Sequence, residues 1–171
     1  MAVKVSVNPT RLTWNHFRVV SSIPSSSEDA QVNPEMSPIQ NVHPQSDGKR
    51  FRLPSLTLFV KINSHNTLVL KSAHKSKELL QHEQGHLDLL VLVTRALARD
   101  LEALEADSVD ELATLLEDAK SLHDERAQAI DAAYDDQTEH SRNVSKQATW
   151  DRAIAQALND PRASKVVDLP L

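Results

Sequence analysis

Two histidines and a glutamate, His82, Glu83 and His86, lie in the short segment His-Glu-Gln-Gly-His. On a helix, residues four apart share one face, so both imidazoles can reach the same metal ion. Glu83 then lies beside the metal, where it can take a proton from a metal-bound water. Zinc lowers the pKa of that water to about 7 and polarises a substrate carbonyl. The segment therefore predicts zinc-dependent hydrolysis, with His82 and His86 as ligands and Glu83 as general base.

The helix expected around this segment places all three side chains on its most apolar side. With about 100° per residue and His82 at 0°, His86 lies at about 40° and Glu83 at about 100°. The same sector holds apolar side chains, namely Leu79, Leu90, Val93 and Leu97. Burying two imidazoles and a carboxylate there without partners would cost several kcal/mol. A metal ion is the simplest common partner, and the alternative is two ordinary histidines with separate hydrogen-bond partners.

A catalytic zinc needs a third protein ligand and one open position. Because the chain has no cysteine, this ligand must be His, Asp or Glu. The candidates after the motif are His123, His140 and several carboxylates, and the residues alone leave the choice open. Asp135 and Asp136 are acceptors that could orient a histidine, or they lie in a solvated turn. Gly85 costs a helix about 1 kcal/mol relative to Ala, which suggests the close approach of a strand.

Composition narrows the function classes further. A chain of 171 residues suits one domain, and a net charge of -5 argues against nucleic acid as a partner. No apolar run approaches the roughly 20 residues of a membrane span. The two glycines rule out a glycine-rich phosphate loop. The N-terminus has no secretory signal, so we expect a cytoplasmic protein, or alternatively the processed form of a secreted or periplasmic one.

Strand patterns come first in the chain and helical patterns follow, which predicts an α+β fold. Before residue 72 we expect a small antiparallel sheet. Its strands are expected at Leu12 to Val20, near residues 30–32, and at Ser55 to Ile62 and Thr67 to Leu70. The last two are separated by Asn63 to Asn66, which is typical of a hairpin loop. The proline- and serine-rich residues 21–49 are otherwise expected to be loop.

Three helices are expected after residue 72. The first runs from about Lys75 to Glu105, with Ser72 or Ser76 as its cap. The second begins after Ser108, where Glu111 completes a capping box, and ends near Ala133. The third spans about Ser145 to Leu158. Residues 1–160 thus form a single domain, and residues 161–171 form a tail or a docked extended segment.

Four motifs, in the same order along residues 11–158, resemble a bacterial family of proposed zinc-dependent, zincin-like proteases that carries a domain-of-unknown-function label. They are Leu12-Thr13-Trp14-Asn15-His16-Phe17, the segment around His82 to Asp88, Tyr134-Asp135-x-x-Thr138-x-His140, and Gln147-x-x-Trp150 with Ile154. Together these motifs are far more specific than the five-residue segment alone. Two residues depart from the family pattern: Leu87 replaces a usual Phe, and Ser141 replaces a common Gly after the third histidine.

The resemblance implies a zincin-like fold, a peptidase that acts on a peptide or protein, and His140 as the third zinc ligand. It also implies that Tyr134 donates to the developing oxyanion, although a core position at a helix end is equally compatible with this residue. In zincins an edge strand often pairs with the substrate, and the segment from Ser55 to Leu70 is the candidate. The alternative function is a non-catalytic metal-binding or protein-interaction module on the same scaffold.

Overall fold

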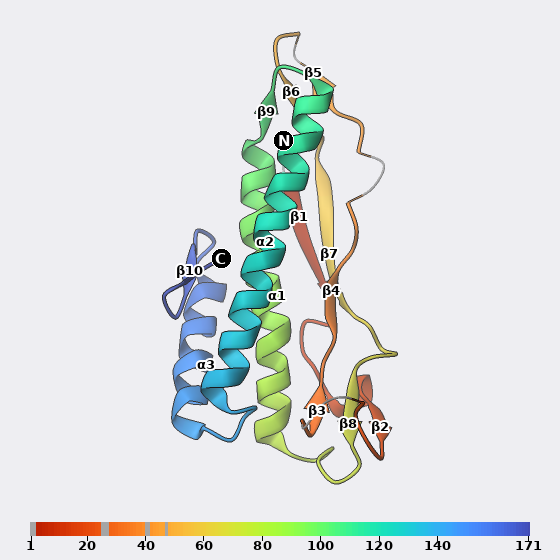
Figure 1. Ribbon diagram of the computed structural model, residues 1–171, viewed down its shortest axis with the longest axis vertical. Coiled ribbons are helices and arrows are strands. Elements are labelled where there is room, and N and C mark those ends of the chain that lie inside the picture. The colour runs from red at the N-terminus through yellow and green to blue at the C-terminus, as the bar shows by residue number, and fades with distance from the viewer. Residues whose placement is uncertain (1–2, 25–27, 40–41, 47) are drawn as a thin grey trace.

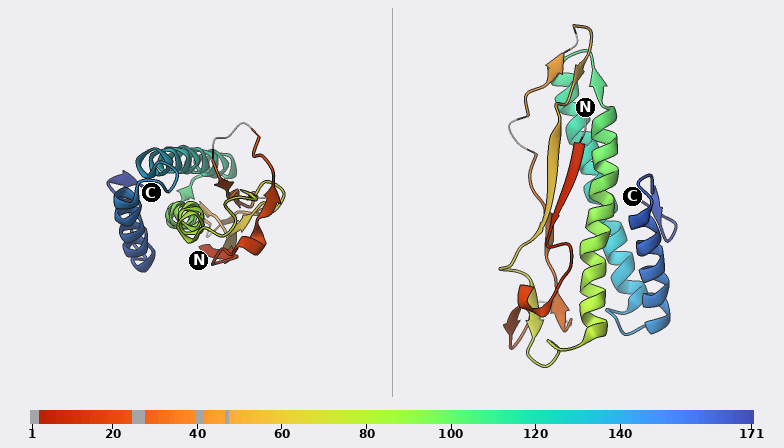
Figure 2. Two further views of the ribbon diagram at one scale, coloured as in Figure 1. Left: turned by 90° about the horizontal axis from the view of Figure 1, so that it is seen from below. Right: turned by 180° about the vertical axis from the view of Figure 1, so that it is seen from behind.

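The computed structural model describes residues 3–24, 28–39, 42–46 and 48–171, and its architecture is α+β, as the sequence predicts. Parts of the predicted loop region, residues 25–27, 40–41 and 47, lie outside the described residues. Helix α1 (Lys77–Ala103) runs the length of the elongated molecule (Figure 1). The view along the helix axes shows α1 in the centre, with the strands on one side, α3 on the opposite side and α2 along a third side (Figure 2).

The three helices begin close to their predicted starts. The α1 cap is Ser76, whose hydroxyl accepts a hydrogen bond from the Leu79 amide at 3.1 Å. Helix α2 (Val109–Thr138) is capped in the same way by Ser108, and α3 is Val144–Asn159. Helix α2 continues five residues past its predicted end at Ala133. None of the helices in the described part of the chain is both long and apolar enough to span a membrane.

The strands that pack on α1 form two mixed sheets, so the prediction of a purely antiparallel sheet was wrong. In the first, β7 (Leu56–Ile62) lies between β1 (Val3–Asn8), which is parallel to it, and β4 (Pro34–Met36), which is antiparallel. In the second, β8 (Leu68–Leu70) lies between the parallel strand β2 (Arg18–Val20) and the antiparallel strand β3 (Ala30–Gln31). Alternation of apolar residues shows which face of a strand is buried, but it does not show the direction of the partner strand.

The predicted hairpin is also absent, because β7 and β8 belong to different sheets. A turn at Asn63 separates them, in which the Asn63 carbonyl accepts from the Asn66 and Thr67 amides at 3.1 and 2.9 Å. Each of the two strands is the central strand of its sheet and is paired on both sides. On the side of β7 away from β1, however, β4 pairs only with Val60, Lys61 and Ile62, so the idea that the segment from Ser55 to Leu70 pairs with a substrate stays a prediction.

The remaining short elements lie at the two ends of the molecule and beside its middle (Figure 1). Leu12 to Val20 is not one strand: a 3-10 helix at Trp14–His16 precedes β2. A third small sheet joins the segments at the far end of α1, with the strands β5 (Gln45–Ser46), β6 (Phe51–Arg52) and β9 (Glu105–Ala106). The last residues form the antiparallel pair β10 (Lys165–Val166) and β11 (Leu169–Pro170). Leu171 is buried there, and its carbonyl accepts from Arg126 at 2.6 Å.

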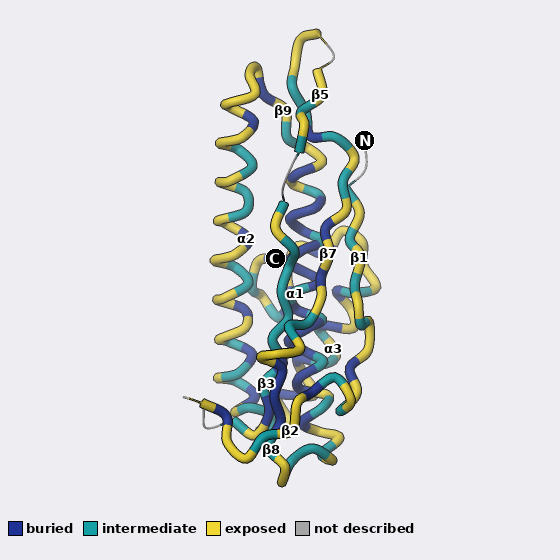
Figure 3. Tube along the Cα trace, turned by 90° about the vertical axis from the view of Figure 1, so that its right-hand side faces the viewer, coloured by how far each residue is buried: buried dark blue, intermediate teal, exposed yellow. Residues whose placement is uncertain are grey.

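Helix α1 supplies side chains to every part of the core, which explains why it is buried along most of its length (Figure 3). One cluster joins α1 to α2, α3 and the C-terminal strands around Tyr134 and Trp150. A second joins α1 to the strands around Val60 and Val69, and a third fills the far end around Leu101 and Leu112. The motif residues lie on α1 where the first two clusters meet, so α1 holds them between the strands and α2.

Candidate metal centre

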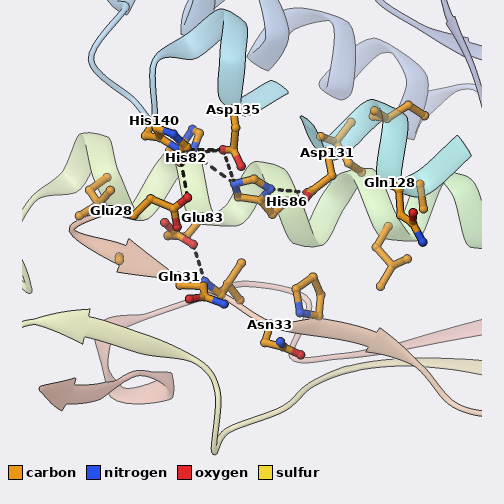
Figure 4. A pocket seen from close by; sticks show the side chains of 18 of the residues that line it. Glu28, Gln31, Asn33, His82, Glu83, His86, Gln128, Asp131, Asp135 and His140 are labelled. Atoms are coloured by element: carbon orange, nitrogen blue, oxygen red, sulfur yellow. Dashed lines mark hydrogen bonds and ion pairs between the residues drawn. The ribbon is translucent and has the colours of Figure 1, made fainter. Parts of the chain in front are cut away.

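His82, Glu83 and His86 lie on the buried face of α1, as the helical spacing predicts, with exposed fractions of 1%, 2% and 8%. The close-up shows the two imidazoles pointing from α1 toward α2 and Glu83 pointing toward the strand segment below (Figure 4). His82 Nε2 and His86 Nε2 are 3.2 Å apart. The structure therefore brings together the two ring nitrogens that the motif predicts as metal ligands.

Asp135 of α2 completes a triangle with these nitrogens. Its Oδ1 lies 3.1 Å from His82 Nε2 and 3.1 Å from His86 Nε2. Three ligands about 2.0–2.1 Å from a tetrahedral zinc ion stand about 3.3 Å from one another. The triangle is therefore of the size that three zinc ligands require, and the donor set of two imidazoles and a carboxylate suits zinc.

Two further side chains set the orientation of the imidazoles. His82 Nδ1 lies 3.1 Å from Gln147 Oε1, and His86 Nδ1 lies 2.6 Å from Asp131 Oδ1. Both acceptors require the proton to be on Nδ1, so each Nε2 of a neutral ring presents its lone pair to the triangle. Two lone pairs and a carboxylate oxygen at this separation repel one another unless a cation or a proton lies among them.

The pKa values of the triangle reflect this arrangement. Burial raises the pKa of Asp135, but hydrogen bonds from His82 and His86 outweigh that effect and hold the pKa well below its usual range. Burial lowers the pKa of His86, but hydrogen bonds to Asp131 and Asp135 outweigh it, so the pKa is raised well above its usual value. Metal binding at such a site competes with protonation of His86.

Glu83 links the motif helix to the strand segment that faces it. Its Oε2 accepts a hydrogen bond from the Val32 amide at 2.6 Å, just beyond β3. Burial raises the pKa of Glu83, and this effect exceeds the opposing influence of His86, His82 and the Val32 amide. A carboxylate of raised pKa is a stronger base than an ordinary surface carboxylate.

Tyr134 lies behind the metal triangle and is fully buried. Its ring stacks on His82 with the centroids 4.6 Å apart, and its hydroxyl donates to the His82 carbonyl at 3.1 Å and accepts from Gln147 at 2.7 Å. Its ring also fills the space beside Gly85, so the close approach expected at that glycine comes from α2 and not from a strand. This placement favours a role for Tyr134 in positioning His82 over the predicted donation to an oxyanion.

The histidines considered as third ligands occupy different places. His140 lies at the edge of the site, with its ring centroid 6.4 Å from that of His82 and its Nδ1 3.4 Å from Asp135 Oδ1. It therefore adjoins the triangle without being one of its corners. His123 is buried elsewhere on α2, 2.8 Å from Asp100 Oδ2. Among the alternatives left open by the sequence, the structure places a carboxylate, Asp135, at the third corner.

A pocket of about 660 Å³ opens onto the triangle between α1, α2 and the strand segment at Asp29–Pro34. Its lining contains five carboxylates and, among the described residues, no Lys or Arg. Near His140 the pocket wall is acidic. Beyond His86, apolar side chains line the wall together with the polar residues Asn33, Gln128 and Asp131 (Figure 4). The apolar wall is formed by Pro34, Leu89, Leu90, Val93, Ala127 and Ile130.

Sequence reasoning did not identify Asp131 or Gln147 as partners of the histidines, and it considered Asp135 as an acceptor for a histidine or a turn residue, not as a corner of the triangle. The sequence does contain a pattern that indicates facing pairs, because Asp131 and Asp135 are four residues apart, as are His82 and His86. Two antiparallel helices with such pairs can face each other across one site. Ending α2 at Ala133 hid this match, since it placed Asp135 in a turn. Glu28, at the acidic end of the pocket, has no motif and could be found only from the fold.

The comparisons with known proteins leave the activity open. No curated protein and no solved structure matches the chain. A family model described as bacterial protein of unknown function (DUF922) matches residues 50–141, which is more than half of the chain and includes the motif helix, α2 and His140. The chain therefore belongs to the DUF922 family of bacterial proteins.

Proposed function

We propose that this protein is a zinc-dependent hydrolase that cleaves amide bonds in peptides, on a zincin-like scaffold. The observation that carries the proposal is the convergence of His82 Nε2, His86 Nε2 and Asp135 Oδ1, at 3.1–3.2 Å from one another, beside the buried carboxylate of Glu83. The resemblance of the four sequence motifs to proposed zinc-dependent proteases supports the same assignment.

The three corners of the triangle would hold the ion, and Gln147 and Asp131 keep the imidazoles in the required tautomer. A zinc ion at such a site supplies a Lewis acid and an activated water molecule near neutral pH. Glu83 accepts the proton of that water and returns it to the leaving amine. The raised pKa of Glu83 suits both transfers, because the carboxylate must first bind the proton and then release it.

A peptide is the substrate class that the strand segment beside the pocket favours. Strands β3 and β4 are edge strands of their sheets, and residues 29–34 line the pocket. The Asp29 carbonyl and the Asn33 backbone bond toward the strand side, to Leu70 and Asn63. Because backbone groups alternate along a strand, those of Ala30 and Val32 point to the opposite side, toward the pocket. The Val32 amide is taken by Glu83, which leaves the Ala30 groups and the Val32 carbonyl for an extended peptide.

The apolar wall beyond His86 favours a substrate with a large apolar side chain close to the bond that is cleaved. Leu90 and Ala127 are half-buried pocket residues, so they offer contact surface to such a side chain. Each buried methylene of that side chain would contribute about 0.8 kcal/mol to binding. Cleavage should therefore occur next to Leu, Ile or Phe more readily than next to Gly or Asp.

The test compares the purified protein with its Glu83→Gln variant in zinc content and in cleavage of a mixture of unstructured peptides, read by mass spectrometry. Both proteins should bind zinc, and the variant should lose at least about 100-fold of the activity, because general acid–base catalysis typically contributes 10²–10⁴-fold. Glu102→Gln, an exposed site on the same helix, is the matched control and should retain full activity.

Three results would contradict the proposal in different ways. Zinc binding without hydrolysis of any peptide by the unaltered protein would support a non-catalytic metal-binding module. Hydrolysis that persists in Glu83→Gln would show that another group accepts the proton. Absence of zinc after reconstitution would remove the premise of the proposal.

A further inference from the structure

A second group of ligand atoms adjoins the metal triangle at the acidic end of the pocket. It consists of Glu28 Oε1, Asp135 Oδ1 and His140 Nδ1, which all lie within 4.8 Å of one another. The His140 nitrogen is 3.4 Å from each of the two carboxylate oxygens. Asp135 belongs to both groups, and Figure 4 shows Glu28 and His140 on the same side of the triangle.

Hydrogen bonding does not account for the position of His140. Its Nδ1 is buried and has no hydrogen-bond partner among the described residues. A charge-assisted hydrogen bond between imidazole and carboxylate would be about 2.7–2.9 Å long, and one N–H cannot point at two acceptors on different sides. A spacing of 3.4 Å is instead close to the roughly 3.3 Å between ligands that share a tetrahedral cation.

The backbone around His140 adopts a costly conformation that brings the imidazole to this place. Glu139, His140 and Ser141 all have positive φ angles, of 51°, 51° and 74°. Each such residue other than glycine costs about 1–2 kcal/mol. Hydrogen bonds from the Asn143 amide to the Thr138 carbonyl, at 2.8 Å, and from the His140 amide to the Asp135 carbonyl hold the turn. Strain of this kind concentrates at binding and catalytic sites.

The pocket that contains both groups is acidic, which favours cations over anions as its ligands. Glu28, Asp29, Glu83, Asp131 and Asp135 line it with five carboxylates, and no Lys or Arg among the described residues lines it.

We propose that Glu28, Asp135 and His140 bind a second divalent cation beside the first, with Asp135 bridging the two ions. Mixed oxygen and imidazole donors suit Zn²⁺ or Mn²⁺. The inference extends the metal centre of the proposed function, but it concerns cation binding and does not require that the protein cleave a peptide.

The test is the metal stoichiometry of the full chain, stripped of metal with a chelator and then titrated calorimetrically with Zn²⁺ and, separately, with Mn²⁺. The unaltered protein should bind two Zn²⁺ ions. Glu28→Gln and His140→Ala should each bind one, because His82, His86 and Asp135 remain intact. His65→Ala, an exposed histidine outside the pocket, is the matched control and should bind two.

The outcomes separate this inference from the proposed function. A stoichiometry of one in the unaltered protein overturns the second site, whatever the variants do. Loss of all zinc in His140→Ala, with one ion bound in the unaltered protein, makes His140 a ligand of a single centre. Two bound ions without peptide cleavage would uphold the second site and end the peptidase proposal, whereas one ion with cleavage would do the reverse.

Discussion

The side chain of Tyr134 occupies the space that a β-carbon at residue 85 would need. A Cβ built on Gly85 would lie 2.6 Å from Tyr134 Cζ and 3.0 Å from Cε1. Tyr134 cannot easily move away, because its hydroxyl bonds to the His82 carbonyl and Gln147, and its ring stacks on His82. One small residue on α1 thus allows α2 to support the ligand His82.

Gly85→Ala should therefore lower the free energy of unfolding by about 1–2 kcal/mol. Overpacking a buried contact costs about 1–3 kcal/mol, which exceeds the gain of about 1 kcal/mol in helix propensity. Urea denaturation gives the value. In a Tyr134→Phe background the cost should shrink, because the hydroxyl that meets the new methyl group is gone. An increase in stability of about 1 kcal/mol in the single variant would contradict the contact.

At the same scale, the sequence predicted the placement of the motif side chains on α1 better than it predicted the residues that face them. The positions of His82, Glu83 and His86 follow from helical periodicity within one element, which is a local property. Asp135 and Glu28 come from elements far apart in the chain, so only the packing of those elements brings them together. A local pattern can therefore identify the motif but not the residues that complete the site.

At the scale of elements, the end of α2 adopts backbone angles that its non-glycine side chains disfavour. The helix ends at Thr138 with a left-handed residue, Glu139, and two more follow before α3 begins. Glycine adopts these angles without a steric penalty. Ser141 occupies the position where glycine is common in the resembled family, and its backbone nevertheless adopts the left-handed conformation.

Ser141→Gly should raise the free energy of unfolding by up to about 1 kcal/mol, since relief of the left-handed strain exceeds the entropy that glycine adds to the unfolded chain. Thermal and urea denaturation measure this difference. The same replacement in the middle of α2, Ser121→Gly, should lower stability by about 0.5 kcal/mol because glycine is a poorer helix former. Equal effects at the two positions would contradict the strained turn.

The helices were also more predictable than the strands. Capping serines and a long apolar period define α1 and α2 locally, and both helices begin within two residues of the expected starts. The strands β7 and β8 were expected at nearly the right residues, but their partners were not. Pairing in a sheet depends on contacts between distant segments such as Val3–Asn8 and Leu56–Ile62, which periodicity does not encode.

At the scale of the whole molecule, the metal triangle joins α1 to α2 near one end of an elongated body. Any ion bound there connects two helices that otherwise meet through apolar packing and a few hydrogen bonds. Ligand binding to the folded state alone raises stability by RT ln(1 + [L]/Kd), which is about 2.7 kcal/mol at 100 times Kd.

Zinc at that excess should raise the melting temperature of the metal-free protein by about 5–10 °C, given about 2–4 °C per kcal/mol for a chain of this size. Differential scanning calorimetry with zinc and with a chelator measures the shift. His82→Ala should abolish most of it, and the exposed control His65→Ala should retain it. Equal melting temperatures with and without zinc would show that no ion joins α1 and α2.

The hydrogen bond from Val32 to Glu83 makes the two oxygens of that carboxylate chemically unequal. Oε2 is held at 2.6 Å by a buried amide, which reduces its basicity. A proton that arrives at Glu83 is therefore directed to Oε1, and the carboxylate can swing only about its anchored oxygen. The same amide cannot pair with a substrate while it holds Glu83, so this bond both orients the carboxylate and withdraws the Val32 N–H from any added strand.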